Sequence, residues 1–227
     1  MIISHKYKFL FFCPVGNCAT TSVYKALLPL HDEKRVERIY EFNFEHPLNK
    51  NPKEILDPQE GIHKDKLIVS KHIPPRRFFE LNFFKEKEFE NYIKFSIVRN
   101  PWDWCLAVFL KASRFPCSQK GFFFNEDHFY NVLSKITTSK NFHKTQYDTL
   151  SNANGECYIT NFLKFENLSN DLTKICGKLA VPPIELGHEQ NNNNETQKKY
   201  QNYYTEKSRQ LVGEYFKKDI EKFNYDF

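Results

Sequence analysis

The residues best suited to chemistry in this chain lie in the segment 13–23, between an apolar run and an amphipathic one. Pro14 and Gly16 break the apolar run, and a cluster of small and hydroxyl residues follows: Asn17, Cys18, Ala19, Thr20, Thr21 and Ser22. A helix that begins in this cluster directs its unpaired backbone N–H groups and the positive end of its dipole at one place. Because such a helix start attracts anions, the segment predicts a phosphate-binding loop.

The same segment does not fit the loop of nucleoside triphosphatases, whose pattern is G-x-x-x-x-G-K-[ST]. No lysine precedes the hydroxyl residues, and no side chain in the segment is an obvious Mg²⁺ ligand. A nucleotide kinase would need that lysine and also a metal-binding acid after a strand. We therefore expect a phosphorylated ligand that binds without a metal ion.

A second candidate is Arg99, which follows the apolar, strand-like segment 92–98 and precedes Asn100 and Pro101. An arginine at the end of a central strand can grip a phosphate through two parallel charge-assisted hydrogen bonds. The alternative is a structural role, in which Arg99 pairs with Asp103 and braces the turn from strand to helix. The residues alone leave both roles open.

Together these segments resemble the sulfotransferase family, whose members use 3′-phosphoadenosine 5′-phosphosulfate (PAPS). The segment 16–23 is similar to the family's 5′-phosphosulfate loop, roughly P-K-x-G-T-T-S-L, and the segment 98–109 to its 3′-phosphate motif, roughly V-R-N-P-x-D-R-x-x-S-x-Y. Segments 161–168 and 219–227 are similar to a later strand and to the usual C-terminus of the family. The branch that the chain resembles most contains carbohydrate sulfotransferases and their smaller relatives, the sulfotransferase family 2 group.

The resemblance implies an enzyme that moves a sulfuryl group from PAPS to a hydroxyl group of a sugar, a glycan or another small metabolite. It implies no metal ion. It assigns the 5′-phosphosulfate to the loop and the 3′-phosphate to Arg99, so the expected donor-binding residues are Gly16, Asn17, Cys18, Ala19, Thr20, Thr21, Ser22 and Arg99.

The resemblance also points to His72 as the base that deprotonates the acceptor, because relatives carry a histidine after the same strand. An imidazole that titrates near neutrality suits that role. The alternative is a histidine that caps the end of a strand. Glu166, also at a strand end, is expected to hold the turn or the scaffold.

Three departures from the family pattern weaken the expectation of catalysis. Asn17 stands where a catalytic lysine is usual, Ala107 where a 3′-phosphate-binding serine is usual, and Trp104 where arginine is usual. Losing a charge-stabilising donor can raise a barrier by roughly 3 kcal/mol. Candidate substitutes are Lys25, Ser113 and Arg114. The alternative function is a weakened or non-catalytic protein of the same fold that binds a nucleotide or an anionic sugar.

The elements that position these residues alternate between strand and helix. Strands are expected at 7–13, 66–70, 92–98 and 157–165, and helices at 21–30, 74–81, 102–113 and 205–223. A further helix is expected from Ser169, with Ser169 or Asn170 as N-cap and Gly177 as its stop. Residues 31–65 are expected to form loops with short helices, 120–139 mostly helix, and 189–196 a flexible loop. This order predicts a three-layer, P-loop-like α/β domain with a mainly parallel sheet flanked by helices.

Composition sets the remaining limits. The 227 residues predict a single domain, and the net charge of +5 suits an anionic ligand but not a dedicated nucleic-acid binder. Six cysteines without a C-x-x-C pair argue against a zinc site and a disulfide framework. No apolar run is long enough for a membrane span or a signal peptide, so the expected location is the cytoplasm.

Overall fold

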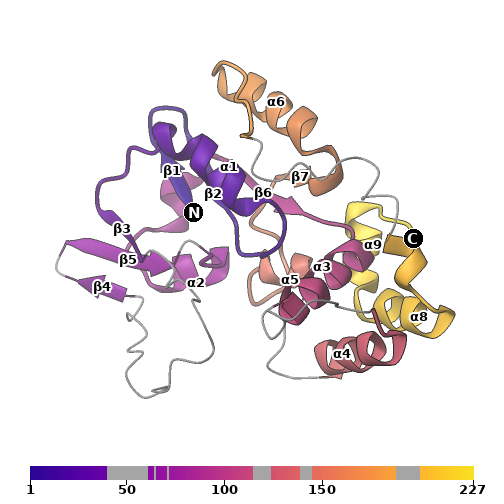
Figure 1. The fold of residues 1–227 in the computed structure, drawn as a ribbon. Helices are drawn as coiled ribbons and strands as arrows, with labels where there is room; N and C mark the ends of the chain where they lie inside the picture. The colour runs from indigo at the N-terminus through magenta and orange to yellow at the C-terminus, as the bar shows by residue number, and fades with distance from the viewer. Residues whose placement is uncertain (40–60, 64, 71, 115–123, 139–144, 188–199) are drawn as a thin grey trace.

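The computed structural model describes residues 1–39, 61–63, 65–70, 72–114, 124–138, 145–187 and 200–227 (Figure 1). The strands are β1 (Ile2–Ser4), β2 (Phe9–Phe12), β3 (Val36–Ile39), β4 (Gly61–His63), β5 (Lys66–Ser70), β6 (Ile93–Val98) and β7 (Asn161–Lys164). The α-helices are α1 (Thr20–Leu27), α2 (Pro75–Glu80), α3 (Pro101–Arg114), α4 (Glu126–Thr138), α5 (Gln146–Thr149), α6 (Leu168–Leu179), α8 (Glu206–Tyr215) and α9 (Lys217–Phe223). Short 3₁₀ turns lie at Leu28–Leu30, Glu86–Phe89, Phe165–Asn167 and Tyr200–Tyr203.

The central sheet has four strands in the order β1-β2-β6-β7. β6 runs parallel to β2 on one side and to β7 on the other, with Phe95 opposite both Phe11 and Asn161. β1 pairs with β2 in the antiparallel direction and was not predicted from the sequence. The carboxyl ends of β2, β6 and β7 therefore meet at one edge of the sheet, where ligands of such sheets bind.

Successive side chains of a central strand point to opposite faces of the sheet, and in β2 the side chains on both faces are apolar and buried. Phe9 and Phe11 of β2 belong to one apolar cluster, which also contains side chains of α1, α3 and α6. Leu10 and Phe12 belong to a second cluster, with side chains of β5, α2 and α9. Figure 1 shows helices on both sides of the sheet. The expected α/β fold with a mainly parallel central sheet flanked by helices is confirmed.

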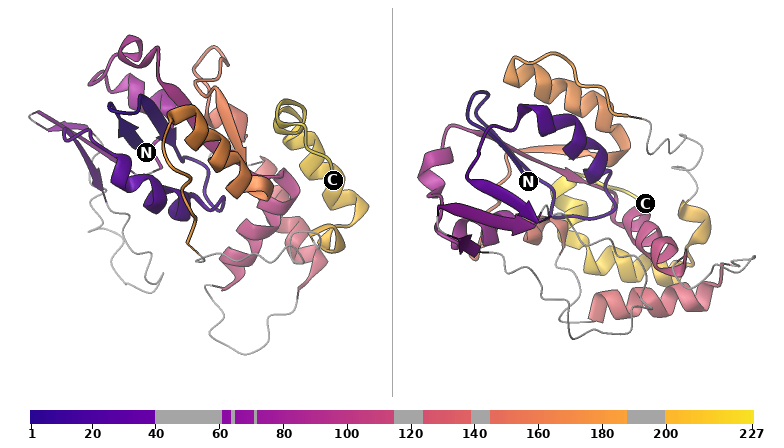
Figure 2. Two further views of the ribbon diagram at one scale, coloured as in Figure 1. Left: turned by 90° about the horizontal axis from the view of Figure 1, so that it is seen from above. Right: turned by 60° about the vertical axis from the view of Figure 1, so that its left-hand side comes forward.

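The expected loops with short helices at 31–65 are wrong at 36–39 and 61–63, where the structure has strands, whereas 31–35 are irregular as expected. β3 and β4 form a second sheet with β5, in the order β3-β5-β4, and β3 runs parallel to β5. Residues 40–60 and 64 lie outside the described part. Prolines in this segment favoured loops, but strands as short as these leave little periodic signal. In the left view of Figure 2, the second sheet lies at the left and the C-terminal helices at the right.

Helix boundaries also differ from those expected. α6 begins at Leu168, with Asn167 as N-cap, because a 3₁₀ turn runs directly into it. It passes through Gly177 and ends at Leu179, and its C-cap, Ala180, adopts the left-handed conformation (φ 53°, ψ 39°). The Val181 N–H bonds back to the Cys176 carbonyl at 3.0 Å, a Schellman-type stop that needs no glycine here.

The expected last helix, 205–223, is broken at Phe216 (φ −95°, ψ 18°) into α8 and α9. The break allows Val212 and Phe216 of one segment and Asp219 and Phe223 of the next to be buried. The expected loop at 189–196 lies outside the described residues. None of the described helices is long and apolar enough to cross a membrane.

Candidate functional site

The loop between β2 and α1 owes its shape to two residues in the left-handed conformation. Asn17 has φ 59°, and Ala19, the N-cap of α1, has φ 52° and ψ 23°. Ala19 makes no side-chain hydrogen bond to the first turn of α1. The first backbone N–H groups of a helix have no partner within the helix. The start of α1 has no capping side chain, and helix starts of this kind are places where anions bind.

The carbonyl oxygens of this loop are held by side chains from the β6–α3 turn. Trp104 donates its indole N–H to the Gly16 carbonyl at 2.9 Å, and Arg99 donates an Nη1 hydrogen to the Asn17 carbonyl at 2.5 Å. The Cys18 thiol also bonds the Gly16 carbonyl, at 3.3 Å. These contacts direct the partial negative charges of two successive carbonyls toward α3. They also join the two sequence motifs into one unit.

The sequence analysis noted Trp104 only as a departure from the family pattern. It did not predict the hydrogen bond from its indole to the Gly16 carbonyl. Its side chain is 4% exposed, and an indole N–H can only donate a hydrogen bond. A buried tryptophan in the first turn of a helix therefore needs an acceptor nearby. That requirement is the signal from which the contact could have been inferred.

Arg99 is almost fully buried, with 7% of its surface exposed. Its Nε donates to the Asp103 carboxylate at 2.7 Å, and its guanidinium lies over the Phe165 ring at 4.0 Å from the centroid. The pairing with Asp103 that formed the structural alternative is thus present. The contact with the Asn17 carbonyl shows that the same side chain reaches the loop. Its role in binding a 3′-phosphate stays a prediction.

Asn100, the next residue, is held by the C-terminal part of the chain. Its backbone N–H donates to Glu166 at 2.6 Å, and its side-chain amide donates to the Tyr200 hydroxyl and the Asp226 carbonyl. The Tyr225 hydroxyl donates to the other oxygen of Glu166 at 3.2 Å. Burial raises the pKa of Glu166, while these hydrogen bonds oppose the rise. Glu166 holds the turn, as its place at a strand end suggested.

His72 lies beside the start of the loop although it is 59 residues away in sequence. Its Nδ1 is 2.5 Å from the Cys13 carbonyl oxygen, and its backbone N–H donates to Ser70 at 3.1 Å. A carbonyl oxygen only accepts, so Nδ1 carries the hydrogen and the neutral ring keeps its lone pair on Nε2. The structure thus brings His72 to the loop in the tautomer that a general base at Nε2 requires. Its catalytic role stays a prediction.

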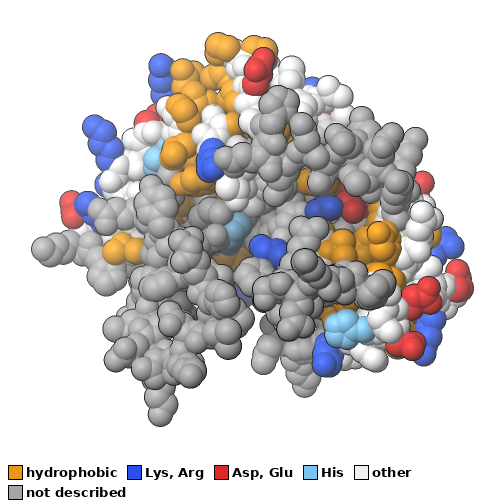
Figure 3. Space-filling model, in the orientation of Figure 1, with side chains coloured by type: hydrophobic (Ala, Val, Ile, Leu, Met, Phe, Trp, Pro, Cys, Tyr) orange, Lys and Arg blue, Asp and Glu red, His pale blue; other side chains and the backbone are white. Residues whose placement is uncertain are grey.

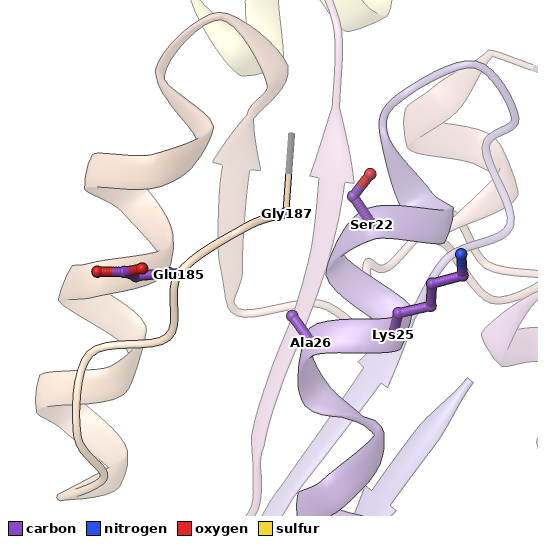
Figure 4. Close-up of a pocket in the computed structure, with 5 residues that line it drawn as sticks. All are labelled: Ser22, Lys25, Ala26, Glu185 and Gly187. Carbon is purple, nitrogen blue, oxygen red and sulfur yellow. The ribbon is translucent and has the colours of Figure 1, made fainter. Parts of the chain in front are cut away.

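A pocket of about 260 Å³ opens between α1 and the segment that follows α6 (Figure 4). It is lined by Ser22, Lys25, Ala26, Glu185 and Gly187. Ser22 and Ala26 lie toward Gly187 in Figure 4, while Lys25 points away from that segment. Because Ser22 belongs to the first turn of α1, the pocket begins next to the loop. Lys25, one of the expected substitute cations, contributes to its wall.

The surrounding surface combines apolar and basic groups. On the face shown in Figure 3, hydrophobic side chains gather around α1 and over the helices on the right, and Lys or Arg side chains lie between them. The other expected substitutes, Ser113 and Arg114, have side chains outside the described part of the chain. Among the side chains that the structure does describe, no group of three or more His, Cys, Asp and Glu is placed to hold a metal ion.

Comparison with known proteins agrees with this geometry. The sequence profile of the Sulfotransferase family matches residues 1–226, nearly the whole chain. The chain therefore belongs to the sulfotransferase family. A search among curated proteins found no match.

Proposed function

We propose that this protein transfers a sulfuryl group from PAPS to a hydroxyl group of a sugar or another small metabolite, on a single P-loop-like domain. The observation that carries the proposal is the contact of Arg99 with the Asn17 carbonyl, at 2.5 Å. It joins the helix-start loop and the strand-end arginine, the two features that a nucleotide with phosphates at its 5′ and 3′ positions requires.

The residues present fit such a donor. Two loop carbonyls are turned toward α3, the start of α1 has no side-chain cap, and hydroxyl residues follow in its first turn. Apart from Gly16 and its two chain neighbours, no atom of the described residues lies within 4 Å of the place where a Cβ on Gly16 would stand, which leaves room beside the loop. The loop would hold the 5′-phosphosulfate, Arg99 the 3′-phosphate, and the pocket beside Ser22 the nucleoside.

The bound donor would supply the sulfuryl group, and the chain's own residues would bind, orient and move a proton. His72 would take the proton of the acceptor hydroxyl at Nε2, with its ring fixed by the hydrogen bond to the Cys13 carbonyl. Asn17 would offer its side-chain amide to the leaving phosphate, a hydrogen bond without a full charge. No residue in this scheme requires a metal ion.

The second candidate function is a binder that no longer catalyses. It is favoured by Asn17, which places a neutral amide where relatives carry a cation, and by Ala107 in place of a hydroxyl. Both residues are in the described part of the chain, and neither can supply the missing group by changing its conformation.

Isothermal titration calorimetry with adenosine 3′,5′-bisphosphate, the product of sulfuryl transfer, tests the binding step. We expect micromolar affinity, unchanged by Mg²⁺ or EDTA, because the loop lacks the lysine and the metal-binding arrangement of triphosphatases. A strict requirement for Mg²⁺, or no binding at all, would show that the proposed donor is wrong.

The variant Asn17→Lys separates the enzyme from the binder. In an enzyme weakened by the missing charge, it should raise the slow hydrolysis of PAPS about tenfold, which corresponds to roughly 1.4 kcal/mol. His72→Ala is the matched variant, since it should leave nucleotide affinity intact and lower transfer to hydroxyl acceptors. No turnover by the unmodified protein or by Asn17→Lys, across a broad panel of acceptors, would favour the binder.

A further inference from the structure

The backbone of Arg99 is paired by a side chain and not by a neighbouring strand. The pairing of β6 with β2 ends at Ser96, and its pairing with β7 ends at Val98. Arg99 is nevertheless buried, so its N–H and C=O need partners. Gln146 supplies both: its Oε1 accepts from the Arg99 N–H at 2.9 Å, and its Nε2 donates to the Arg99 carbonyl at 2.7 Å. One amide side chain thus takes the place of a strand.

Gln146 is itself held from α9. The two oxygens of Asp219 accept the backbone N–H groups of Gln146 and Tyr147, each at 2.8 Å. Asp219 is fully buried and Gln146 is 3% exposed, so water does not compete for these bonds. Asp219 therefore fixes the start of α5, from which Gln146 reaches Arg99.

The other end of this chain of contacts is the phosphate loop. The Arg99 guanidinium donates to the Asn17 carbonyl, and its second partner, Asp103, keeps it in that direction. A long side chain can serve a binding site only if its own backbone is fixed. The contacts therefore run without a gap from Asp219 through Gln146 and Arg99 to Asn17.

We propose that Gln146 is a positioning residue that sets the reach of Arg99 toward the loop and the 3′-phosphate, and that Asp219 acts through Gln146. The part of this proposal that concerns the 3′-phosphate rests on the function proposed above. The part that concerns the loop does not, because the contact with the Asn17 carbonyl exists in the protein alone.

The main test compares Gln146→Met with Ser151→Ala. Methionine keeps much of the volume of glutamine but cannot replace its two hydrogen bonds. Ser151 is a matched control, because its buried hydroxyl also bonds α5, at the Tyr147 carbonyl, but does not touch Arg99. Calorimetry with adenosine 3′,5′-bisphosphate and with adenosine 5′-phosphate measures the role of the 3′ group. We expect Gln146→Met to weaken binding of the bisphosphate about tenfold and binding of the monophosphate less than about twofold. We expect Ser151→Ala to change neither affinity.

A second measurement needs no nucleotide. Cys18 is a fully buried residue of the loop, and alkylation of its thiol requires the loop to open. We expect Gln146→Met to speed the alkylation of Cys18, followed by peptide mass spectrometry, about tenfold over wild type, and Ser151→Ala to leave it unchanged. Asp219→Asn, which keeps one acceptor for α5, should act in the same direction with a smaller change. It serves as the test variant if Gln146→Met does not fold.

The outcomes separate the two proposals. If wild type does not bind the bisphosphate, the proposed function is wrong, and the Cys18 rates still decide whether Gln146 positions the loop contact. The positioning role is overturned, and the proposed function stands, in two cases in which wild type binds the bisphosphate. In the first, Gln146→Met weakens binding of both nucleotides equally; in the second, Cys18 of this variant is alkylated at the wild-type rate.

Discussion

The two parts of the candidate site, the loop 13–19 and the turn at Arg99 and Asn100, touch each other but are built from different contacts. The loop contributes backbone groups: two left-handed residues shape it, and two of its carbonyls accept hydrogen bonds from Arg99 and Trp104. The turn depends on side chains from distant segments, among them Gln146 and Glu166.

This difference predicts how each part responds to mutation. A loop shaped by φ and ψ tolerates a change of side chain as long as the new residue accepts the same backbone conformation. A turn held by buried side chains loses a partner with each substitution, and a buried polar group without a partner is costly. The departures of this chain from the family pattern in the loop, such as Asn17, are therefore compatible with a loop that keeps its shape.

The strongest test of this comparison is Arg99→Ala, which removes the side chain that both parts share. The variant leaves the Asp103 carboxylate, 11% exposed, without its cation. Breaking a buried ion pair in this way should lower the free energy of unfolding by about 3–5 kcal/mol, measured by urea denaturation. Adding Asp103→Asn should recover part of the loss, because the unpaired charge is then absent. A loss below about 1 kcal/mol would contradict the central role of this pair.

Nucleotide binding by the same variant distinguishes the two roles of Arg99. If Arg99 grips the 3′-phosphate, Arg99→Ala weakens adenosine 3′,5′-bisphosphate by about 2 kcal/mol and leaves adenosine 5′-phosphate nearly unaffected. Equal losses for the two nucleotides would show that Arg99 only braces the turn.

The next test concerns the turn at Arg99 and Asn100, because Asp219, which holds Gln146, should make the free energy of unfolding depend on pH. Burial raises the pKa of Asp219 to about 6, although the N–H groups of Tyr147 and Gln146 favour the carboxylate. In the unfolded chain this pKa is near 3.8, so between these values the folded protein binds the proton more tightly. This contribution to stability is present below about pH 4 and is lost as the pH rises through about 6, in total about 3 kcal/mol.

Urea denaturation of wild type and Asp219→Asn across this range measures that contribution. The difference in unfolding free energy between the two proteins should change by about 3 kcal/mol across this range. The contributions of the other carboxylates cancel in this difference, because both proteins contain them. Glu33 is an example, since its pKa is lowered to about 2, by hydrogen bonds with Arg35 and His5 that outweigh its burial. A difference that does not vary with pH would show that Asp219 titrates at an ordinary pKa.

The contrast between the loop and the turn also explains which parts of this site could be predicted from the sequence. The loop and Arg99 were found in the sequence because each lies at the end of an apolar strand, and strand ends meet at one edge of a parallel sheet. His72 was found through the resemblance to the family, since it follows β5, which belongs to the second sheet. Gln146 was not found, because nothing near it in sequence marks a buried amide that replaces a strand. Its partners, Arg99 and Asp219, lie 47 and 73 residues away.

The same reasoning explains the errors in the fold. Longer, mostly apolar segments such as 92–98 predicted the central strands, whereas β3 and β4 are strands of three or four residues with polar members. The continuous helix expected at 205–223 had the right periodicity, but burial of Asp219 against α5 decided where it breaks. Tertiary contacts overrode local pattern at both places.

The smallest expected effect belongs to the backbone-built loop, at Ala19. An alanine in the left-handed conformation is strained by roughly 1–2 kcal/mol, and a glycine there is not. Ala19→Gly relieves this strain but frees the unfolded chain and removes a partly buried methyl group, so the three terms nearly cancel. We expect a change in unfolding free energy of less than about 0.5 kcal/mol, with nucleotide affinity unchanged.

Ala19→Val is the matched control for this prediction. A β-branched residue fits the left-handed conformation poorly, so the variant should be destabilised by about 2 kcal/mol although valine is the more hydrophobic residue. Urea denaturation of the two variants side by side then reports on conformation more than on side-chain contact. If Ala19→Gly were as damaging as Arg99→Ala, the loop would depend on its side chains as the turn does, and the distinction between the two parts of the site would fail.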